Sequence, residues 1–142
     1  MFRQTDFPIC FFGHSHFPVV FALSPDAITT ILTEDVGVAV DQRFVFVSDD
    51  KGEVAAYSRE SGGNAWKNDK LSYRRLSTPV SFGRAVAIGD YQGYVHFLSR
   101  EDGSYIGRAA TDGSPIQSDP VIAGANLIFQ TQSGTVTALA VE

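Results

Sequence analysis

A repeat of 41 residues constrains the fold of this chain more than any other feature. Glycines recur at this interval, each after a short apolar run and each followed two positions later by valine. Several independent positions keep the same spacing, so coincidence is a poor explanation. The repeated landmarks are Gly52, Gly93 and Gly134; Val54, Val95 and Val136; Pro79-Val80 and Pro120-Val121; and Gly62 and Gly103.

The middle copy of the repeat, residues 85–108, predicts three short strands joined by two tight turns. Residues 85–88 form an apolar run, and residues 94–98 are rich in aromatic and branched side chains. Gly93 ends the first turn and can adopt a positive φ there. Because an isolated antiparallel meander is marginally stable at best, it needs neighbours on its faces, and the other copies supply them.

A period of this length with strands alone predicts an all-β fold built from β-propeller blades. We expect a partial β-propeller of about two and a half to three four-stranded antiparallel blades, preceded by a short β segment. The units are residues 36–76, 77–117 and 118–142, and the last unit stops after its third strand. A β-sandwich with regular hairpins is the alternative, although its strands need not repeat at a fixed period.

Composition excludes several functional classes. The chain has 142 residues, of which 44% are hydrophobic and 19% charged, as expected for a globular protein. Its net charge of −5 argues against non-specific binding to nucleic acid. Cys10 is the single cysteine, so no intramolecular disulfide can form. We find no apolar run long enough to span a membrane, no secretory signal and no lipobox, so as written the chain is expected to be cytoplasmic.

Residues 1–34 do not follow the repeat and predict strands near residues 8–13, 18–23 and 28–32. The motif Gly13-His14-Ser15-His16 lies between the first two. Residues 7–32 thereby resemble the C-terminal Gly-His-x-His segment of calcineurin-like metallophosphoesterases. This resemblance implies that His14 and His16 are metal ligands. The other motifs of that family are missing, so the alternatives are an inactive phosphoesterase fragment, adventitious metal binding, or two turn histidines without a role.

A second resemblance covers residues 36–142. The first unit has a predicted strand followed by Ser61-Gly62 and, four residues after Gly62, by Trp66. This order is typical of the pyrroloquinoline-quinone-type propeller repeat, in which the tryptophan docks between adjacent blades. Gly107 stands at the corresponding place in the second unit, so we expect Tyr105 or Ile106 to fill that seam. The segments KLSYRRLSTPVSFGRAVAIGDYQGYVHFLSREDG and DPVIAGANLIFQTQSGTVTALA resemble the C-terminal blades of the BamB family of outer-membrane protein assembly factors.

That resemblance implies a non-catalytic scaffold without cofactors, located at the periplasmic face of the outer membrane. Its partner would be the barrel-inserting subunit of the barrel-assembly machinery. Binding would use turns between strands, because loops on rigid scaffolds commonly carry function. For the aromatic residues, packing within the turn is an equally weighted alternative. The candidate partner-binding residues are Asp49, Asp50, Tyr91, Gln92 and Tyr94.

Propellers of the family resemble closed rings of eight blades, whereas this sequence encodes fewer than three. The chain therefore looks like a fusion of two fragments, with the change near residues 33–38. We expect the first and last units to leave apolar faces open. Either strands from residues 1–34 or a second copy of the chain could cover these faces. A quinoprotein dehydrogenase is a further alternative, but its cofactor sits with calcium on the axis of a complete ring.

Overall fold

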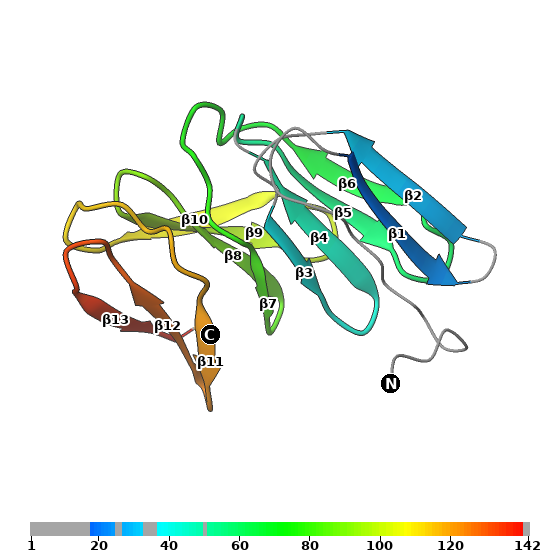
Figure 1. The fold of residues 1–142 in the computed structure, drawn as a ribbon. Coiled ribbons are helices and arrows are strands. Elements are labelled where there is room, and N and C mark those ends of the chain that lie inside the picture. Colours follow the sequence, from blue (N-terminus) through cyan, green and yellow to red (C-terminus); the bar gives the residue numbers. More distant parts are fainter. Residues whose placement is uncertain (1–17, 25–26, 33–36, 50, 141–142) are drawn as a thin grey trace, which may run out of the picture.

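The computed structural model describes residues 18–24, 27–32, 37–49 and 51–140. These residues form four antiparallel sheets that lie side by side and contain no helix (Figure 1). The N-terminal hairpin is β1 (Pro18–Ser24) with β2 (Ala27–Leu32). The first four-stranded sheet contains β3 (Gly37–Val40), β4 (Phe44–Ser48), β5 (Val54–Ser58) and β6 (Asn64–Asn68). The second contains β7 (Val80–Phe82), β8 (Ala85–Gly89), β9 (Tyr94–Ser99) and β10 (Tyr105–Ala110). The third contains β11 (Val121–Ala123), β12 (Asn126–Gln130) and β13 (Val136–Leu139).

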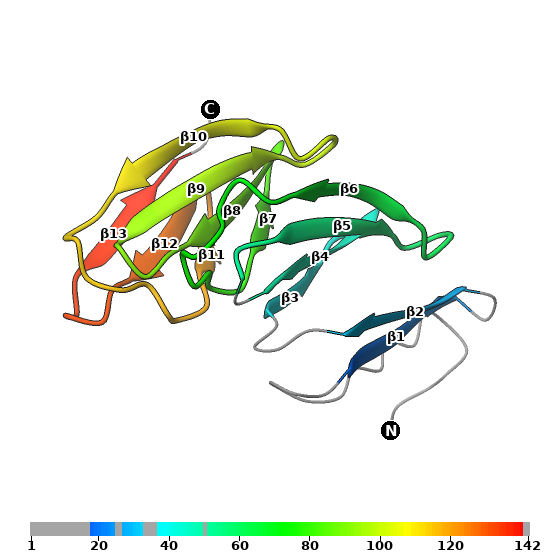
Figure 2. The same ribbon diagram turned by 90° about the horizontal axis from the view of Figure 1, so that it is seen from above.

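Each of the three larger sheets is a meander whose strands pair in chain order. Viewed from above, the sheets follow one another as successive blades (Figure 2). The chain is therefore a partial β-propeller, as the 41-residue period predicts. The third sheet has three strands in the described residues, which also agrees with the sequence.

Burial follows the position of each sheet in the row. Every residue of β4 and β8 is buried, as expected for an apolar second strand covered on both faces. In β12 the same repeat position alternates instead, with Leu127 and Phe129 buried and Asn126 and Gln130 exposed. The alternation arises because the second sheet covers only one face of the third.

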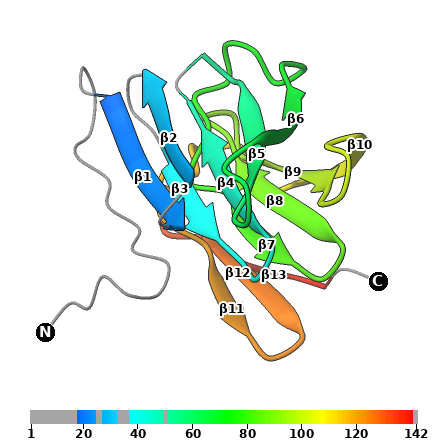
Figure 3. The same cartoon turned by 90° about the vertical axis from the view of Figure 1, so that its right-hand side faces the viewer.

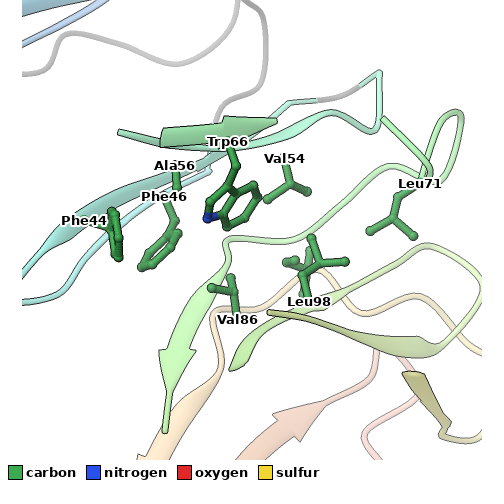
Figure 4. Close-up of a cluster of buried hydrophobic side chains, with 9 residues drawn as sticks. Phe44, Phe46, Val54, Ala56, Trp66, Leu71, Val86 and Leu98 are labelled. Carbon is green, nitrogen blue, oxygen red and sulfur yellow. The ribbon is translucent and has the colours of Figure 1, made fainter. Parts of the chain in front are cut away.

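Trp66 closes the seam between the first and second sheets (Figure 4). Its ring lies 6.1 Å from the ring of Phe46, centroid to centroid, and packs in one cluster with Val86 and Leu98 of the second sheet. A Cβ atom on Gly103 would lie 2.3 Å from the indole, and Gly103 has a φ of +72°. Glycine is therefore required at the turn on which the indole rests. The predicted docking of the tryptophan between blades is confirmed.

The prediction for the second seam is wrong. Tyr105 and Ile106 are 46% and 53% exposed and do not fill it. Instead, Ile116 from the segment between β10 and β11 packs with Leu127 and Phe129 of the third sheet against the second. The seam is filled by Ile116, which follows β10 within the same unit, because the side chains of Tyr105 and Ile106 lie at the surface.

Among the residues whose burial the structure describes, exposed large hydrophobic side chains gather on the third sheet and not on the first. Val121, Ile122 and Val136 of the third sheet are exposed, as predicted. The first sheet exposes a single large hydrophobic side chain among its strand residues, Val40, so the prediction is wrong there.

The hairpin β1–β2 lies beside the first sheet but forms a two-stranded sheet of its own (Figure 3). The hairpin therefore does not add strands to a blade. Addition of strands from residues 1–34 was one of the two ways in which we expected the apolar faces to be covered. The other, self-association, stays a prediction. The strand expected near residues 8–13 lies outside the described residues. Among the described residues, no helix is long and apolar enough to cross a membrane.

Candidate protein-interaction site

The segment between β6 and β7, residues 69–79, passes over one end of the first two sheets. Leu71 is buried in the core beneath it, and Leu76 packs against the same cluster. Both leucines fix the segment to the body of the protein. Of the four residues between them, Ser72, Tyr73 and Arg75 are exposed and Arg74 is half-buried.

Two of these residues adopt a conformation that non-glycine residues rarely take. Tyr73 has a φ of 65° and Arg75 a φ of 50°. Each such residue costs on the order of 1–3 kcal/mol, and such residues cluster at functional sites. No other described non-glycine residue has a positive φ. The conformation therefore marks this segment out within the described fold.

Backbone hydrogen bonds hold the segment against the turns between strands. The amide of Tyr73 donates to the carbonyl of Lys51 at 3.0 Å, and the amide of Tyr91 donates to the carbonyl of Arg74 at 2.9 Å. The segment approaches the first turn so closely that a Cβ atom on Gly52 would lie 2.0 Å from the Leu71 carbonyl oxygen. The first repeated glycine thus allows this crossing as well as the turn.

Asp90, buried in the turn between β8 and β9, binds the side chain of Arg74. One carboxylate oxygen accepts from Arg74 Nη1 at 3.1 Å and from His96 Nε2 at 2.7 Å. The other accepts from the amides of Gln92 and Tyr94. Burial alone would raise the pKa of Asp90, but the hydrogen bonds from His96, the Tyr94 amide and Arg74 lower it below its ordinary value. Asp90 is thus an ionised anchor for Arg74.

The resulting surface is aromatic and cationic, and we call it the linker face. Tyr73 is 94% exposed and Tyr91 is 46% exposed. The Arg75 guanidinium lies 5.5 Å from the centroid of the Tyr91 ring, and Gln92 accepts a hydrogen bond from Arg74. Its members are Tyr73, Arg74, Arg75, Tyr91 and Gln92.

The structure brings Tyr91 and Gln92 together on the linker face and leaves other predicted residues apart. Tyr94 is half-buried, with the Arg108 guanidinium 4.4 Å from its ring centroid. Asp49 closes its own turn by accepting from the amide of Glu53 at 2.7 Å. Asp50, together with the predicted metal ligands His14 and His16, lies outside the described residues.

Sequence reasoning missed Tyr73, Arg74 and Arg75 as site residues. Their one signal is an aromatic–arginine run between two leucines, and it does not reveal the strained backbone. Across the described residues, no three His, Cys, Asp or Glu side chains converge into a group that could hold a metal ion. What the described residues present on the linker face is a set of aromatic and cationic side chains on a fixed backbone.

Comparisons with known proteins identify what this fold is similar to. A family model described as outer membrane protein assembly factor BamB matches residues 15–72. The chain is similar to part of BamB. The matched range begins within residues 7–32, the segment whose Gly-His-x-His motif resembles that of metallophosphoesterases. That relationship is not supported.

Curated relatives agree with the family model. BamB of Burkholderia pseudomallei is 49% identical over 100 residues, which cover 70% of this chain and 26% of that protein. BamB of Bordetella pertussis is 40% identical over 100 residues, which again cover 70% of this chain and 26% of that protein. The chain spans about a quarter of the length of these relatives. The similarity therefore concerns a portion of BamB.

Solved structures agree on the fold. The crystal structure of BamB from Moraxella catarrhalis superposes with a TM-score of 0.70 at 29% identity, covering 82% of this chain and 34% of that one. The computationally designed Ika4 protein reaches the same TM-score at 12% identity, covering all of both chains. At that identity the designed protein supports the fold alone.

Proposed function

We propose that this chain is a non-catalytic, protein-binding part of an outer-membrane protein assembly scaffold. The linker face is its contact surface. The observation that carries the proposal is the strained and exposed pair Tyr73 and Arg75, held on either side of an arginine anchored to buried Asp90. Similarity to BamB supplies the biological setting.

The composition and rigidity of the linker face suit protein recognition. Tyrosine and arginine are the residue types enriched at interface hot spots. Because both ends of the segment are fixed by buried or packed leucines, little conformational freedom remains to be lost on binding. A fitting partner presents an apolar recess for Tyr73 and a carboxylate for Arg75.

The residues proposed from the sequence take different places in this surface. In this proposal Tyr91 and Gln92 belong to the linker face. Tyr94 and Asp49 lie outside it and contribute less to binding, because their side chains already contact Arg108 and the Glu53 amide. We keep Asp50 in the proposal for one reason, which is its position next to Asp49 in the sequence.

The proposed partner is the barrel-inserting subunit of the barrel-assembly machinery, at the periplasmic face of the outer membrane. The proposed organisation is a blade region of residues 35–142, with units 36–76, 77–117 and 118–142, after a separate β segment of residues 1–34. In this proposal the chain carries no catalytic group and no cofactor, and it binds protein rather than nucleic acid.

A matched pair of arginine substitutions tests the proposal. The probe is the purified barrel-inserting subunit of Burkholderia pseudomallei, the source of a similar BamB. We expect Arg75→Ala to weaken binding by about tenfold or more, as at a hot spot. Arg84→Ala removes another exposed arginine, from the turn between β7 and β8, and is expected to leave affinity unchanged. Equal affinity of both variants and the unsubstituted chain would refute the assignment of the surface.

A further inference from the structure

A chain of hydrogen-bonded side chains, buried at its centre, connects strand β10 to the linker face through the second sheet. His96 and Asp90 are both buried, and His96 Nε2 lies 2.7 Å from the Asp90 carboxylate. On its other side, His96 Nδ1 lies 3.3 Å from the hydroxyl of Tyr105. Since a carboxylate only accepts, Nε2 carries the hydrogen in this bond, and in the neutral ring Nδ1 accepts from Tyr105. The chain ends at Arg74, which binds the same oxygen of Asp90.

The repeat shows that this chain of side chains is not a general requirement of the blade. The positions equivalent to His96, 41 residues before and after it, are Ala55 and Thr137. The position equivalent to Arg74 in the next connecting segment is Pro115. None of these three residues can reproduce the contacts of its counterpart.

The backbone contact of the connecting segment does repeat. The amide of Gln132 donates to the carbonyl of Pro115 at 2.7 Å, as the amide of Tyr91 donates to the carbonyl of Arg74 at 2.9 Å. A connecting segment can therefore cross the end of a sheet without a buried histidine. The second crossing does so without any positive-φ residue other than glycine. The extra side chains coincide with the one segment whose backbone is strained.

We propose that His96 is a positioning residue of the linker face: through Asp90 it holds Arg74, and thereby the strained conformation of Tyr73 and Arg75. This inference rests on the proposed function for its biological meaning. The hydrogen bond from His96 fixes the carboxylate in the orientation that receives the guanidinium. Without it, Asp90 keeps its bonds to the amides of Gln92 and Tyr94, but its second oxygen is left with Arg74 as its one side-chain partner in the described structure.

Amide hydrogen exchange in the full chain tests this inference directly. The amide of Tyr91 reports on contact with Arg74, and the amide of Gln132 reports on the equivalent contact of the next segment. His96→Leu removes the donor to Asp90, whereas His96→Gln retains an N–H donor in its place. We expect His96→Leu to speed exchange at Tyr91 by roughly 10- to 100-fold relative to Gln132, the loss expected for a hydrogen bond to a charged group. His96→Gln should restore most of the protection.

Equal acceleration at Tyr91 and Gln132 would show a general loss of stability and overturn the inference, as would failure of His96→Gln to restore protection. Arg74→Met provides a second test from the surface side if the leucine variant does not fold. It should speed exchange at Tyr91 selectively, and unchanged exchange would overturn the inference. These readouts involve no partner. Selective exchange effects with unchanged binding to the barrel-inserting subunit would refute the proposed function while leaving the positioning role intact.

Discussion

The indole nitrogen of Trp66, on the outermost strand of the first sheet, donates a hydrogen bond of 2.9 Å to the backbone carbonyl of Arg100 in the second. Asn68, two residues further along β6, donates a second bond of 2.6 Å to the carbonyl of Gly103. Both acceptors lie around the turn between β9 and β10. The first repeat unit is therefore joined to the second by polar contacts as well as by apolar packing.

Truncation of Trp66 should destabilise the protein strongly. Trp66→Leu removes the hydrogen bond to Arg100 and leaves a cavity beside Phe46. We expect the free energy of unfolding to fall by about 3–4 kcal/mol in urea denaturation. Val136→Ala, at an exposed site, should change it by less than about 0.5 kcal/mol. Similar losses in both variants would contradict the role assigned to the seam.

Two repeated glycines separate the effect of a close approach from that of backbone strain. Gly52 and Gly134 have φ values of +94° and +97°, but only Gly52 faces another part of the chain. Both alanine variants therefore carry the strain of a positive φ, about 1 kcal/mol or more. Gly52→Ala should lose markedly more stability, because its Cβ would meet the Leu71 carbonyl. Equal melting temperatures of the two variants would argue against this crossing.

The conformation of Tyr73 predicts a conflict between stability and binding. Glycine relieves the positive φ, so Tyr73→Gly should keep or raise the free energy of unfolding, by up to about 1 kcal/mol. The same variant should bind the barrel-inserting subunit more weakly. Tyr91 has an ordinary φ, so Tyr91→Gly should lower stability. A clear loss of stability in Tyr73→Gly would contradict the observed backbone.

Acid should weaken the contact between the first two sheets. Burial alone would raise the pKa of Asp41, but hydrogen bonds from Arg100, the Phe44 and Arg43 amides and Ser81 lower it from 3.8 to about 2. Because the folded-state pKa lies below the unfolded one, this stabilisation is complete above about pH 4 and is lost as the pH falls to 2. Urea titrations at pH 7, 4 and 2 should show a smaller loss in Asp41→Asn. Parallel losses in variant and unsubstituted chain would exclude Asp41 as a contributor.

Self-association through the third sheet remains a prediction. Val121, Ile122 and Val136 present an exposed apolar surface, and a second copy of the chain could cover it. Light scattering should then show a mass that rises with concentration, and Val136→Lys should shift the chain towards monomer. A monomer at every concentration in the unsubstituted chain would refute the prediction.

Strands with local signals could be predicted from the sequence, and features created by tertiary contacts could not. Apolar runs identified β4 and β8, and Trp66 identified the first seam. The second seam was misassigned because its filling residue, Ile116, comes from beyond β10 and not from the position equivalent to Trp66. Nothing local in Tyr73 or Arg75 signals a positive φ. Their segment contacts the turn of Lys51 and, through Arg74, the side chain of Asp90, and both lie more than ten residues away in the sequence. Tyr91 and Gln92 were predicted as contact residues because they occupy a turn, and that role stays a prediction.

Hydrogen exchange of the chain with and without the barrel-inserting subunit is the most direct test of the central claim. The account predicts that protection on binding concentrates in residues 71–76 and 91–93, the two segments that carry the linker face. Protection confined to the opposite turns, around residues 41–43 and 100–103, or to the third sheet would contradict it.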